Sequence, residues 1–225
     1  MVTMRLLRDS ILQTKCKTCL CSATRAAVLV LCLLASSTQL LAADEESPRV
    51  YWDAETRITW DYFQAAIPPF HPSTENSAIN TGIEWSCKYA MRRSSDEQTY
   101  SLCVVPDDLV AVAWMNPENS WVDRTVVTAN SLEYMRLQFD LQHVYAQRLQ
   151  IDLLAIEEKI TATNQANTIV QSVAQPILDA CREATRRCGV ETQLGSSPKE
   201  LSEWIAAVSS WLETPRLAPL SWENG

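Results

Sequence analysis

One uninterrupted stretch, residues 130–159, limits the folds open to this chain more than any other feature. It contains neither Gly nor Pro, and its apolar residues recur at the spacing of a helix that is buried on more than one side. Asn130 followed by Glu133 predicts a capping box at its start. At ~1.5 Å per residue this helix would be roughly 45 Å long, so the rest of the domain is expected to pack around it. Its apolar positions are Leu132, Met135, Leu137, Phe139, Leu141, Val144, Tyr145, Ala146, Leu149, Leu153 and Ile156.

The region before this helix has the pattern of β-strands. Residues 77–92 alternate between apolar and polar side chains, which predicts one half-buried strand. Residues 99–105 and 109–115 are expected to form two further strands, and residues 120–122 a short extended segment. Three Pro within residues 67–72 predict a loop, because Pro fits neither a helix interior nor a central strand.

Two more helices are expected after the long one. The first covers residues 161–187, where Pro176 should kink or split it and Gly189 should mark its end. The second begins at Ser197 with the pattern S-P-K-E and runs to Leu212. Residues 216–225 are predicted to be an irregular tail. The predicted fold class is therefore α+β: a small antiparallel β-sheet packed against a long central helix and two further helices, in one domain over residues 44–215.

The N-terminus has the features of an export signal. Five Lys or Arg residues precede the apolar run at residues 26–34, and Ala42 and Ala43 provide small residues for cleavage. The run is shorter than the ~20 residues of a membrane-spanning helix. We therefore expect residues 1–43 to be a cleaved signal peptide and the protein to be periplasmic or extracellular. Membrane contact would occur only through this segment, if it stayed uncleaved.

The charge of the remaining chain excludes one class of partner. After residue 43 the sequence holds 14 basic and 26 acidic residues, and binding to nucleic acid requires a basic face. Four Gly in the whole chain also argue against a Gly-rich phosphate-binding loop. The expected partner is an unidentified protein or peptide.

Four cysteines remain after the signal peptide: Cys87, Cys103, Cys181 and Cys188. An even number suits an oxidising compartment, and four cysteines allow three pairings. Nearness in sequence favours Cys87–Cys103 and Cys181–Cys188. Strand alternation places Cys87 and Cys103 on opposite faces, however, so the first pairing would need a bulge between them.

Three segments in a fixed order carry a family resemblance. They are ITWDYF at residues 58–63 with AINTGI at 78–83, then SWV at 120–122, then LEYMRLQFDL at 132–141 followed by YA at 145–146. Together they resemble a bacterial family of predicted secreted zinc-dependent proteases, catalogued largely as a domain of unknown function. The family motifs are L-T-W-x-D-F, A-x-T-x-x-G-I, S-W-V and L-x-H-E-x-x-H-F-D-[IL]-x-E-x-Y-A-R-x-L. The resemblance covers residues 50–189 and implies a zincin-like scaffold.

The metal-binding residues of that family are missing here. The resemblance implies two His, four residues apart on one helix face, that bind zinc, and a Glu between them that activates water. Those positions are Tyr134, Gln138 and Met135 in this chain, and a further family His corresponds to Cys188. Zinc is thus the cofactor that the family implies, but the ligands are absent, and we predict no cofactor. His143 stands where the family has Glu.

The leading hypothesis is an exported, non-catalytic member of this family that keeps the scaffold for binding or a structural envelope role. Its former cleft beside Tyr134 and Gln138, near Trp121, would be a binding pocket or be filled. Another hypothesis is a structural or partner-binding envelope protein, in which the exposed side of the Trp-rich surface contacts a partner.

The enzyme alternative is a secreted metal-dependent peptidase or hydrolase with a non-standard ligand set. The chain has only two His. His71 lies in the Pro-rich loop and is expected to be a surface residue. Asp140 and His143, three residues apart on the long helix, are weak metal candidates, and Cys188 or Glu133 would have to complete the site.

Overall fold

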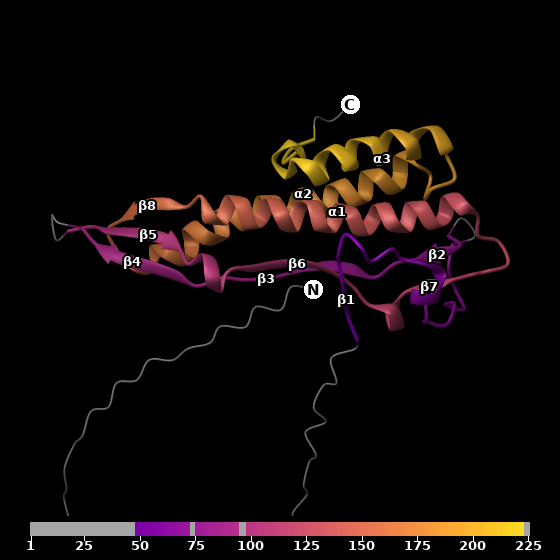
Figure 1. The fold of residues 1–225 in the computed structure, drawn as a ribbon, viewed down its shortest axis with the longest axis horizontal. Coiled ribbons are helices and arrows are strands. Elements are labelled where there is room, and N and C mark those ends of the chain that lie inside the picture. Colours follow the sequence, from indigo (N-terminus) through magenta and orange to yellow (C-terminus); the bar gives the residue numbers. More distant parts are fainter. Residues whose placement is uncertain (1–47, 73–74, 95–97, 223–225) are drawn as a thin grey trace, which may run out of the picture. The chain divides into compact units, whose positions relative to one another are not determined.

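The computed structural model describes residues 48–72, 75–94 and 98–222. The expected signal peptide, residues 1–43, lies outside the described residues. The α+β class is confirmed, with three helices and several small antiparallel sheets (Figure 1). The helices are α1 (Ala129–Leu154), α2 (Gln165–Glu191) and α3 (Pro198–Glu213).

The strands form three sheets rather than the single small sheet expected. The sheet orders are β1–β6–β3, β2–β7 and β4–β5–β8, and every pairing is antiparallel. The strands are β1 (Val50–Tyr51), β2 (Ser77–Ala78), β3 (Thr81–Ser86), β4 (Tyr89–Arg93), β5 (Tyr100–Val104), β6 (Val110–Met115), β7 (Trp121–Val122) and β8 (Glu157–Ile160). Short 3-10 turns occur at Trp60–Tyr62, Pro106–Asp108, Pro117–Asn119 and Pro215–Leu217.

The strand predicted over residues 77–92 is divided among β2, β3 and β4. β3 pairs with β6 as far as Ser86–Val110, and β4 pairs with β5 from Tyr89–Val104. Between these pairs, residues 105–109 of one side face only residues 87–88 of the other. The surplus residues form a 3-10 turn, which interrupts the ladder as a bulge does. Alternation in the sequence reports the two faces but not this break.

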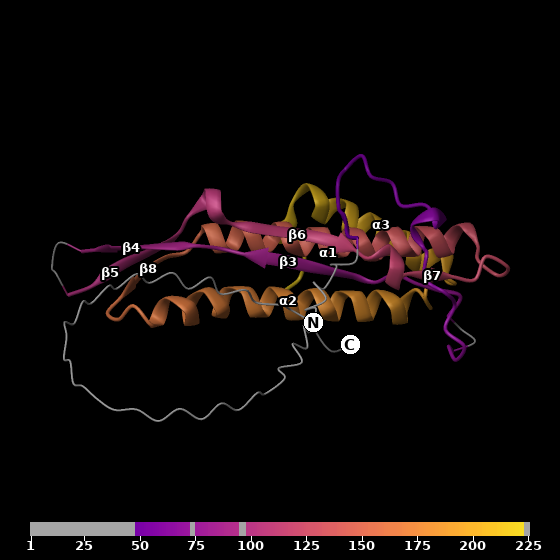
Figure 2. The ribbon, with the colours of Figure 1, turned by 90° about the horizontal axis from the view of Figure 1, so that it is seen from below.

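Helix α1 lies at the centre of the described residues. β3 and β6 run along one side of it, while α2 and α3 pack on other sides (Figures 1 and 2). The prediction of burial on several sides is confirmed, since Leu137, Leu141, Val144 and Tyr145 are all at most 2% exposed.

Both ends of α1 differ from the prediction. Thr128 is the N-cap and forms a capping box with Ser131, in place of Asn130 with Glu133. The helix ends at Leu154, and residues that were expected to continue it form β8, which pairs with β5. Tertiary pairing thus overrides the local helical preference of Glu157–Ile160, in which no Gly or Pro signals a stop.

Helix α2 is a single helix despite Pro176. Pro176 removes the hydrogen bond to the carbonyl of Ser172, and both residues lie on the exposed side of the helix. Gly189 does not end the helix either, because α2 continues to Glu191.

The segment after α3 is irregular except for its 3-10 turn, yet it is fixed to α1. Tyr145 Oη donates to Pro219 O at 2.8 Å, and Ala218 is 1% exposed. Trp222 packs against Trp204 and Trp211, with ring centroids 5.7 and 6.3 Å away.

The predicted disulfides are absent, and all four cysteines of the described residues are free. Cys181 and Cys188 are seven residues apart on α2, about 10 Å along the axis, which is too far for a disulfide. Cys103 faces Ala90 across the β4–β5 ladder, and Cys87 is three residues further along the strand, also about 10 Å away.

Candidate functional site

Three of the four positions that the resemblance aligns with the family's zinc site come together in the structure. Tyr134 and Gln138 lie one turn apart on α1 and face the last turns of α2, which carry Cys188. They are 6%, 4% and 0% exposed. The Gln138 amide interacts with the Cys188 sulfur, and the Tyr134 hydroxyl lies above the adjacent Gly189. The fourth position, Met135, is about 100° around the helix from Tyr134 and packs in the hydrophobic core.

Two of the chain's four glycines make room for Tyr134. A Cβ at Gly189 would lie 3.0 Å from the Tyr134 hydroxyl, and a Cβ at Gly195 would lie 2.6 Å from the Tyr134 Cβ. The end of α2 and the turn after it can therefore approach the Tyr134 side chain closely. Gly189, predicted as a helix stop, serves this close packing instead.

The turn that follows α2 is held in a costly conformation beside Tyr134. Gln193, Leu194 and Gly195 have φ angles of 51°, 56° and 86°, in the left-handed region that L-residues with side chains rarely adopt. The buried Thr192 fixes it: its hydroxyl donates to Cys188 O at 2.6 Å and accepts from Gly195 N at 3.2 Å. Strain of this kind persists only where the surroundings enforce it.

A second buried pair of Gln and Cys lies one turn further along α1. Cys181 Sγ donates to Gln142 Oε1 at 3.4 Å, and Gln142 Nε2 donates to Thr185 Oγ1 at 3.2 Å. The α1–α2 contact therefore contains two glutamines facing two thiols, and the resemblance aligns one of these glutamines, Gln138, with a family histidine.

The groups at this contact are uncharged at neutral pH. Burial raises the pKa of Cys188 to about 12, and it raises the pKa of Tyr134 as well. Gln138 is neutral, and among the described residues its Nε2 has no hydrogen-bond partner of normal geometry. Zinc requires deprotonated thiolates or basic nitrogen and carboxylate ligands. Of the three side chains only the thiol of Cys188 is a good zinc ligand once deprotonated, so the cluster lacks the three good ligands of a catalytic zinc site.

Asp140 and His143 lie on the opposite face of α1, beside Trp52. The indole Nε1 of Trp52 donates to Asp140 Oδ1 at 2.8 Å, and the His143 ring stacks on Trp52 with centroids 3.4 Å apart and planes 9° apart. Burial lowers the pKa of His143 to about 4, so the ring is neutral at pH 7. Burial also raises the pKa of Asp140, while the indole hydrogen bond opposes that shift.

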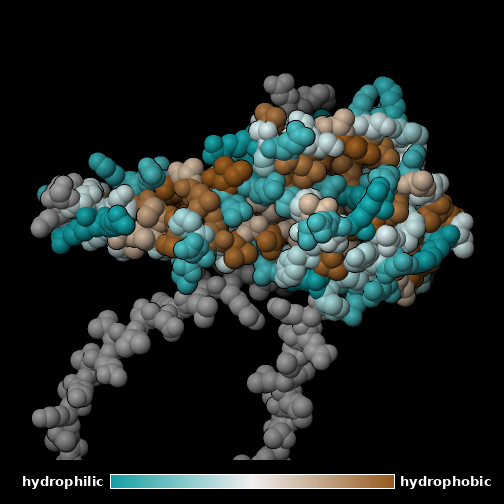
Figure 3. Space-filling model, in the orientation of Figure 1, coloured by the Kyte–Doolittle hydropathy of each residue, from teal (hydrophilic) through white to brown (hydrophobic). Residues whose placement is uncertain are grey.

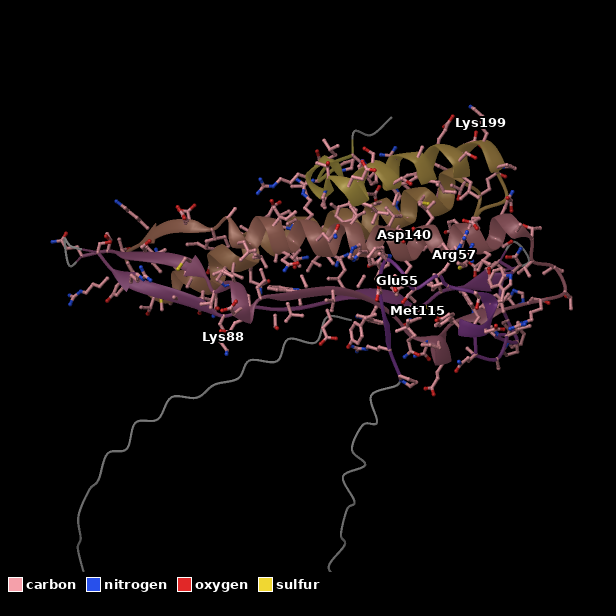
Figure 4. All side chains as sticks on the ribbon, viewed as in Figure 1. Glu55, Arg57, Lys88, Met115, Asp140 and Lys199 are labelled. Atoms are coloured by element: carbon pink, nitrogen blue, oxygen red, sulfur yellow. The ribbon has the colours of Figure 1, made fainter. Side chains whose placement is uncertain are left out.

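A pocket of about 260 Å³ opens on this second face. The segment between β1 and the first 3-10 turn forms one wall, and α1 forms the other (Figure 4). Its lining residues are Trp52, Asp53, Ala54, Thr56, Arg57, Ile58, Glu133, Arg136, Phe139 and Asp140. Arg136 joins the walls, since its Nε donates to Ile58 O at 2.8 Å and its Nη1 pairs with Glu133 Oε1 at 2.5 Å.

The non-standard ligand set is not brought together. At about 100° per residue, Asp140 and His143 point away from the face of α1 that meets Cys188. Over the described ranges no three His, Cys, Asp or Glu residues are placed to hold a metal ion. Nor is any helix of the described chain long and apolar enough to cross a membrane.

A Trp-rich contact surface stays a prediction. Two of the eight Trp are buried, Trp204 and Trp121, the latter expected at the cleft and 7% exposed, and the other six are partly exposed. His71 lies against Trp121, with ring centroids 4.9 Å apart. The most exposed large apolar side chain among the described residues is Phe70, at 95%. On the face in Figure 3 hydrophobic residues gather beside α1, and the far end of β4 and β5 is hydrophilic.

Several residues of these two regions were not found from the sequence. Trp52 and Arg57 lie in a segment without periodicity, and no motif marks them as pocket residues. Gly195 and Thr192 follow a helix end that was placed too early. The one available signal was the scarcity of Gly, because a rare Gly next to a bulky core residue suggests a close approach.

Comparisons with protein-family models, with curated proteins and with solved structures found no match in any of the three.

Proposed function

We propose that this protein is an exported, non-catalytic relative of the zinc-dependent protease family that it resembles, and that it keeps the scaffold for a binding or structural role outside the cytoplasm. One observation carries the proposal. Tyr134 and Gln138, at the two helix positions of the zinc ligands, meet Cys188, at the position of the third ligand.

The filling of these positions supports a loss of catalysis. A catalytic zinc needs three good ligands and one open coordination position for water. Here the three side chains are neutral and nearly inaccessible, and two glycines adapt the neighbouring backbone to Tyr134. On this proposal, protein side chains occupy the place that the metal has in the family, and Met135 supplies no base. The metal-dependent alternative has less support, because Asp140 and His143 face away from Cys188.

The proposal is tested by restoring the ligands. The double variant Tyr134→His with Gln138→His, together with the native Cys188, should bind one zinc per chain, because the three positions already converge. The same variant with Cys188→Ser should bind zinc at least about tenfold more weakly, since it loses one of three ligands. A control pair, Ser202→His with Ala206→His, puts the same spacing on an exposed face of α3 and lacks a third ligand. Zinc content and zinc-dependent thermal stabilisation provide the measurement.

Two results would decide against the proposal. If the folded double variant binds no more zinc than the control pair, the correspondence with the family's metal site is wrong. If the native protein carries stoichiometric zinc and peptidase activity, both lost on replacing Asp140 or His143, it is an enzyme. Should the double variant not fold, Gln138→His with and without Cys188→Ser gives the same comparison at lower affinity.

A further inference from the structure

The open pocket beside α1 contains charges of both signs that are not fully paired with each other. Its acidic residues are Asp53, Glu133 and Asp140, and its basic residues are Arg57 and Arg136. The two signs come from both walls, so neither wall alone defines the ligand. Figure 4 labels Arg57, from the segment after β1, and Asp140, from α1.

The basic group available to a ligand is Arg57. Its side chain is 75% exposed, and its ion pair with Glu133 Oε1 is loose, at 3.7 Å. That same oxygen is held more closely by Arg136, at 2.5 Å. An exposed ion pair of this length contributes little, so Arg57 can turn to a carboxylate at low cost.

The acidic group available to a ligand is Asp140. Within the described chain its carboxylate accepts one hydrogen bond, from the Trp52 indole to Oδ1, which leaves Oδ2 for a donor. The carboxylate is partly buried beside an aromatic wall, and burial raises its pKa. A cation at Oδ2 would therefore bind favourably, because it would neutralise a carboxylate that burial leaves poorly hydrated.

We propose that this pocket binds a small zwitterion of the amino-acid class, whose carboxylate pairs with Arg57 and whose ammonium group pairs with Asp140. A lone anion would meet three carboxylates, and a lone cation would leave Arg57 unmatched. Metal ions lack a three-ligand site anywhere in the described residues. A ligand with both charges satisfies both walls.

The size and the apolar part of the pocket limit the ligand further. A volume of about 260 Å³ corresponds to roughly nine waters at ~30 Å³ each, enough for a free amino acid and less than drug-sized ligands occupy. Trp52, Ile58 and Phe139 add apolar lining suited to an aliphatic side chain. Trp52 is held between Asp140 and His143, so this wall is preformed.

The inference rests on the binding role in the proposed function, but not on the lost zinc site, which lies on the opposite face of α1. The two can therefore fail separately. Zinc binding in the restored variant tests the ancestry of the scaffold, whereas amino-acid binding tests the pocket.

Isothermal titration of the purified protein with L-valine at pH 7 tests the inference. Isobutylamine lacks the carboxylate of valine and 3-methylbutanoate lacks its ammonium group, so each should bind at least about tenfold more weakly than valine. The dipeptide L-alanyl-L-valine carries the same charges further apart. Tighter binding of valine assigns the site to free amino acids, and tighter binding of the dipeptide assigns it to short peptides.

Two variants locate the binding. Arg57→Gln and Asp140→Asn should each weaken binding of the preferred ligand at least about tenfold. Asn keeps an oxygen that can accept from the Trp52 indole, so the wall should stay in place. Lys199→Gln is the matched control, because Lys199 is 78% exposed in a loose 3.6 Å ion pair on α3, away from the pocket (Figure 4).

Three outcomes would overturn the inference. The first is that isobutylamine or 3-methylbutanoate binds as well as valine, and the second is that Arg57→Gln leaves binding unchanged in a protein with native circular dichroism. The third is that valine, glycine, lysine and the dipeptide all show no saturable binding up to about 10 mM.

Discussion

The two faces of α1 differ in whether their polar side chains are buried or in contact with water. The face toward α2 carries Tyr134, Gln138 and Gln142, which are neutral and at most 8% exposed. The face toward the segment after β1 carries Glu133 and Asp140, which are charged groups beside an open pocket. One face is closed by close packing, and the other keeps contact with water.

The difference follows from the cost of burying each kind of polar group. Neutral amides and hydroxyls can be buried at moderate cost when they meet partners, whereas carboxylates must stay solvated or paired. The face toward α2, which carries Tyr134, Gln138 and Gln142, holds neutral polar groups, and it is sealed. The opposite face keeps its charges, and it stays open. A binding role is thus expected on the face that the family resemblance does not mark.

The largest effect that tests the closed face is expected from Gly195→Ala. The new Cβ would lie 2.6 Å from the Tyr134 Cβ, and Ala would have to adopt a φ of 86°. Steric overlap and left-handed strain together should lower the free energy of unfolding by about 3 kcal/mol. Urea denaturation measures it, with Gly82→Ala as the comparison: there the new Cβ would lie 2.7 Å from Trp114 Cζ2, a similarly close contact, but no positive φ is required, so a smaller loss is expected. A loss below about 1 kcal/mol would mean that the turn is not packed on Tyr134.

A smaller effect with a change of sign is expected at Gly189. With Tyr134 present, Gly189→Ala places a Cβ 3.0 Å from the tyrosine hydroxyl and should destabilise the protein by about 1 kcal/mol. In a Tyr134→Phe background that hydroxyl is gone. The gain in helix propensity from Gly to Ala, up to about 1 kcal/mol, should then make the same substitution stabilising.

The four proteins of this double-mutant cycle are compared by urea unfolding. A coupling free energy of about 1–2 kcal/mol is expected between the two positions. Additive effects would show that Tyr134 does not lie over Gly189, and the closed face would lose its main structural support.

The fold could be predicted wherever periodicity decides it. The α+β class, the buried sides of α1 and the strands at β5 and β6 follow from patterns of 3.6 and 2 residues. The errors occur where tertiary contacts decide. β8 is a strand that pairs with β5, and Gly189 lies inside α2, where its lack of a Cβ leaves room for the Tyr134 hydroxyl. A local pattern does not report such contacts.

The candidate sites could be predicted only in part. The resemblance selected Tyr134, Gln138 and Cys188, which do meet, although Cys188 is 50 residues beyond Gln138 in the sequence. It gave no sign of the pocket, because Arg57 and Asp140 come from segments that approach each other only in the fold. Pairing of cysteines by nearness in sequence failed for a related reason: seven residues along a helix separate Cys181 from Cys188.

The smallest effect concerns acid stability at the open face. His143 has a pKa of about 4 in the folded protein because of burial, against about 6.5 in an unfolded chain. The unfolded state therefore binds a proton more readily, so stability is full above pH 6.5 and falls as the pH drops from 6.5 to 4. Because the ring is partly exposed, we expect a loss of about 1 kcal/mol rather than the full value of the shift.

His143→Gln should remove this loss in urea unfolding at pH 7.5 and pH 4.5, whereas replacing the only other histidine, His71→Gln, should keep it. Asp140 acts in the opposite direction, since burial raises its pKa, but it is present in all three proteins and cancels from the comparison. Equal pH dependence in the native protein and His143→Gln would show that His143 is solvated and that Trp52 does not form a fixed wall of the pocket.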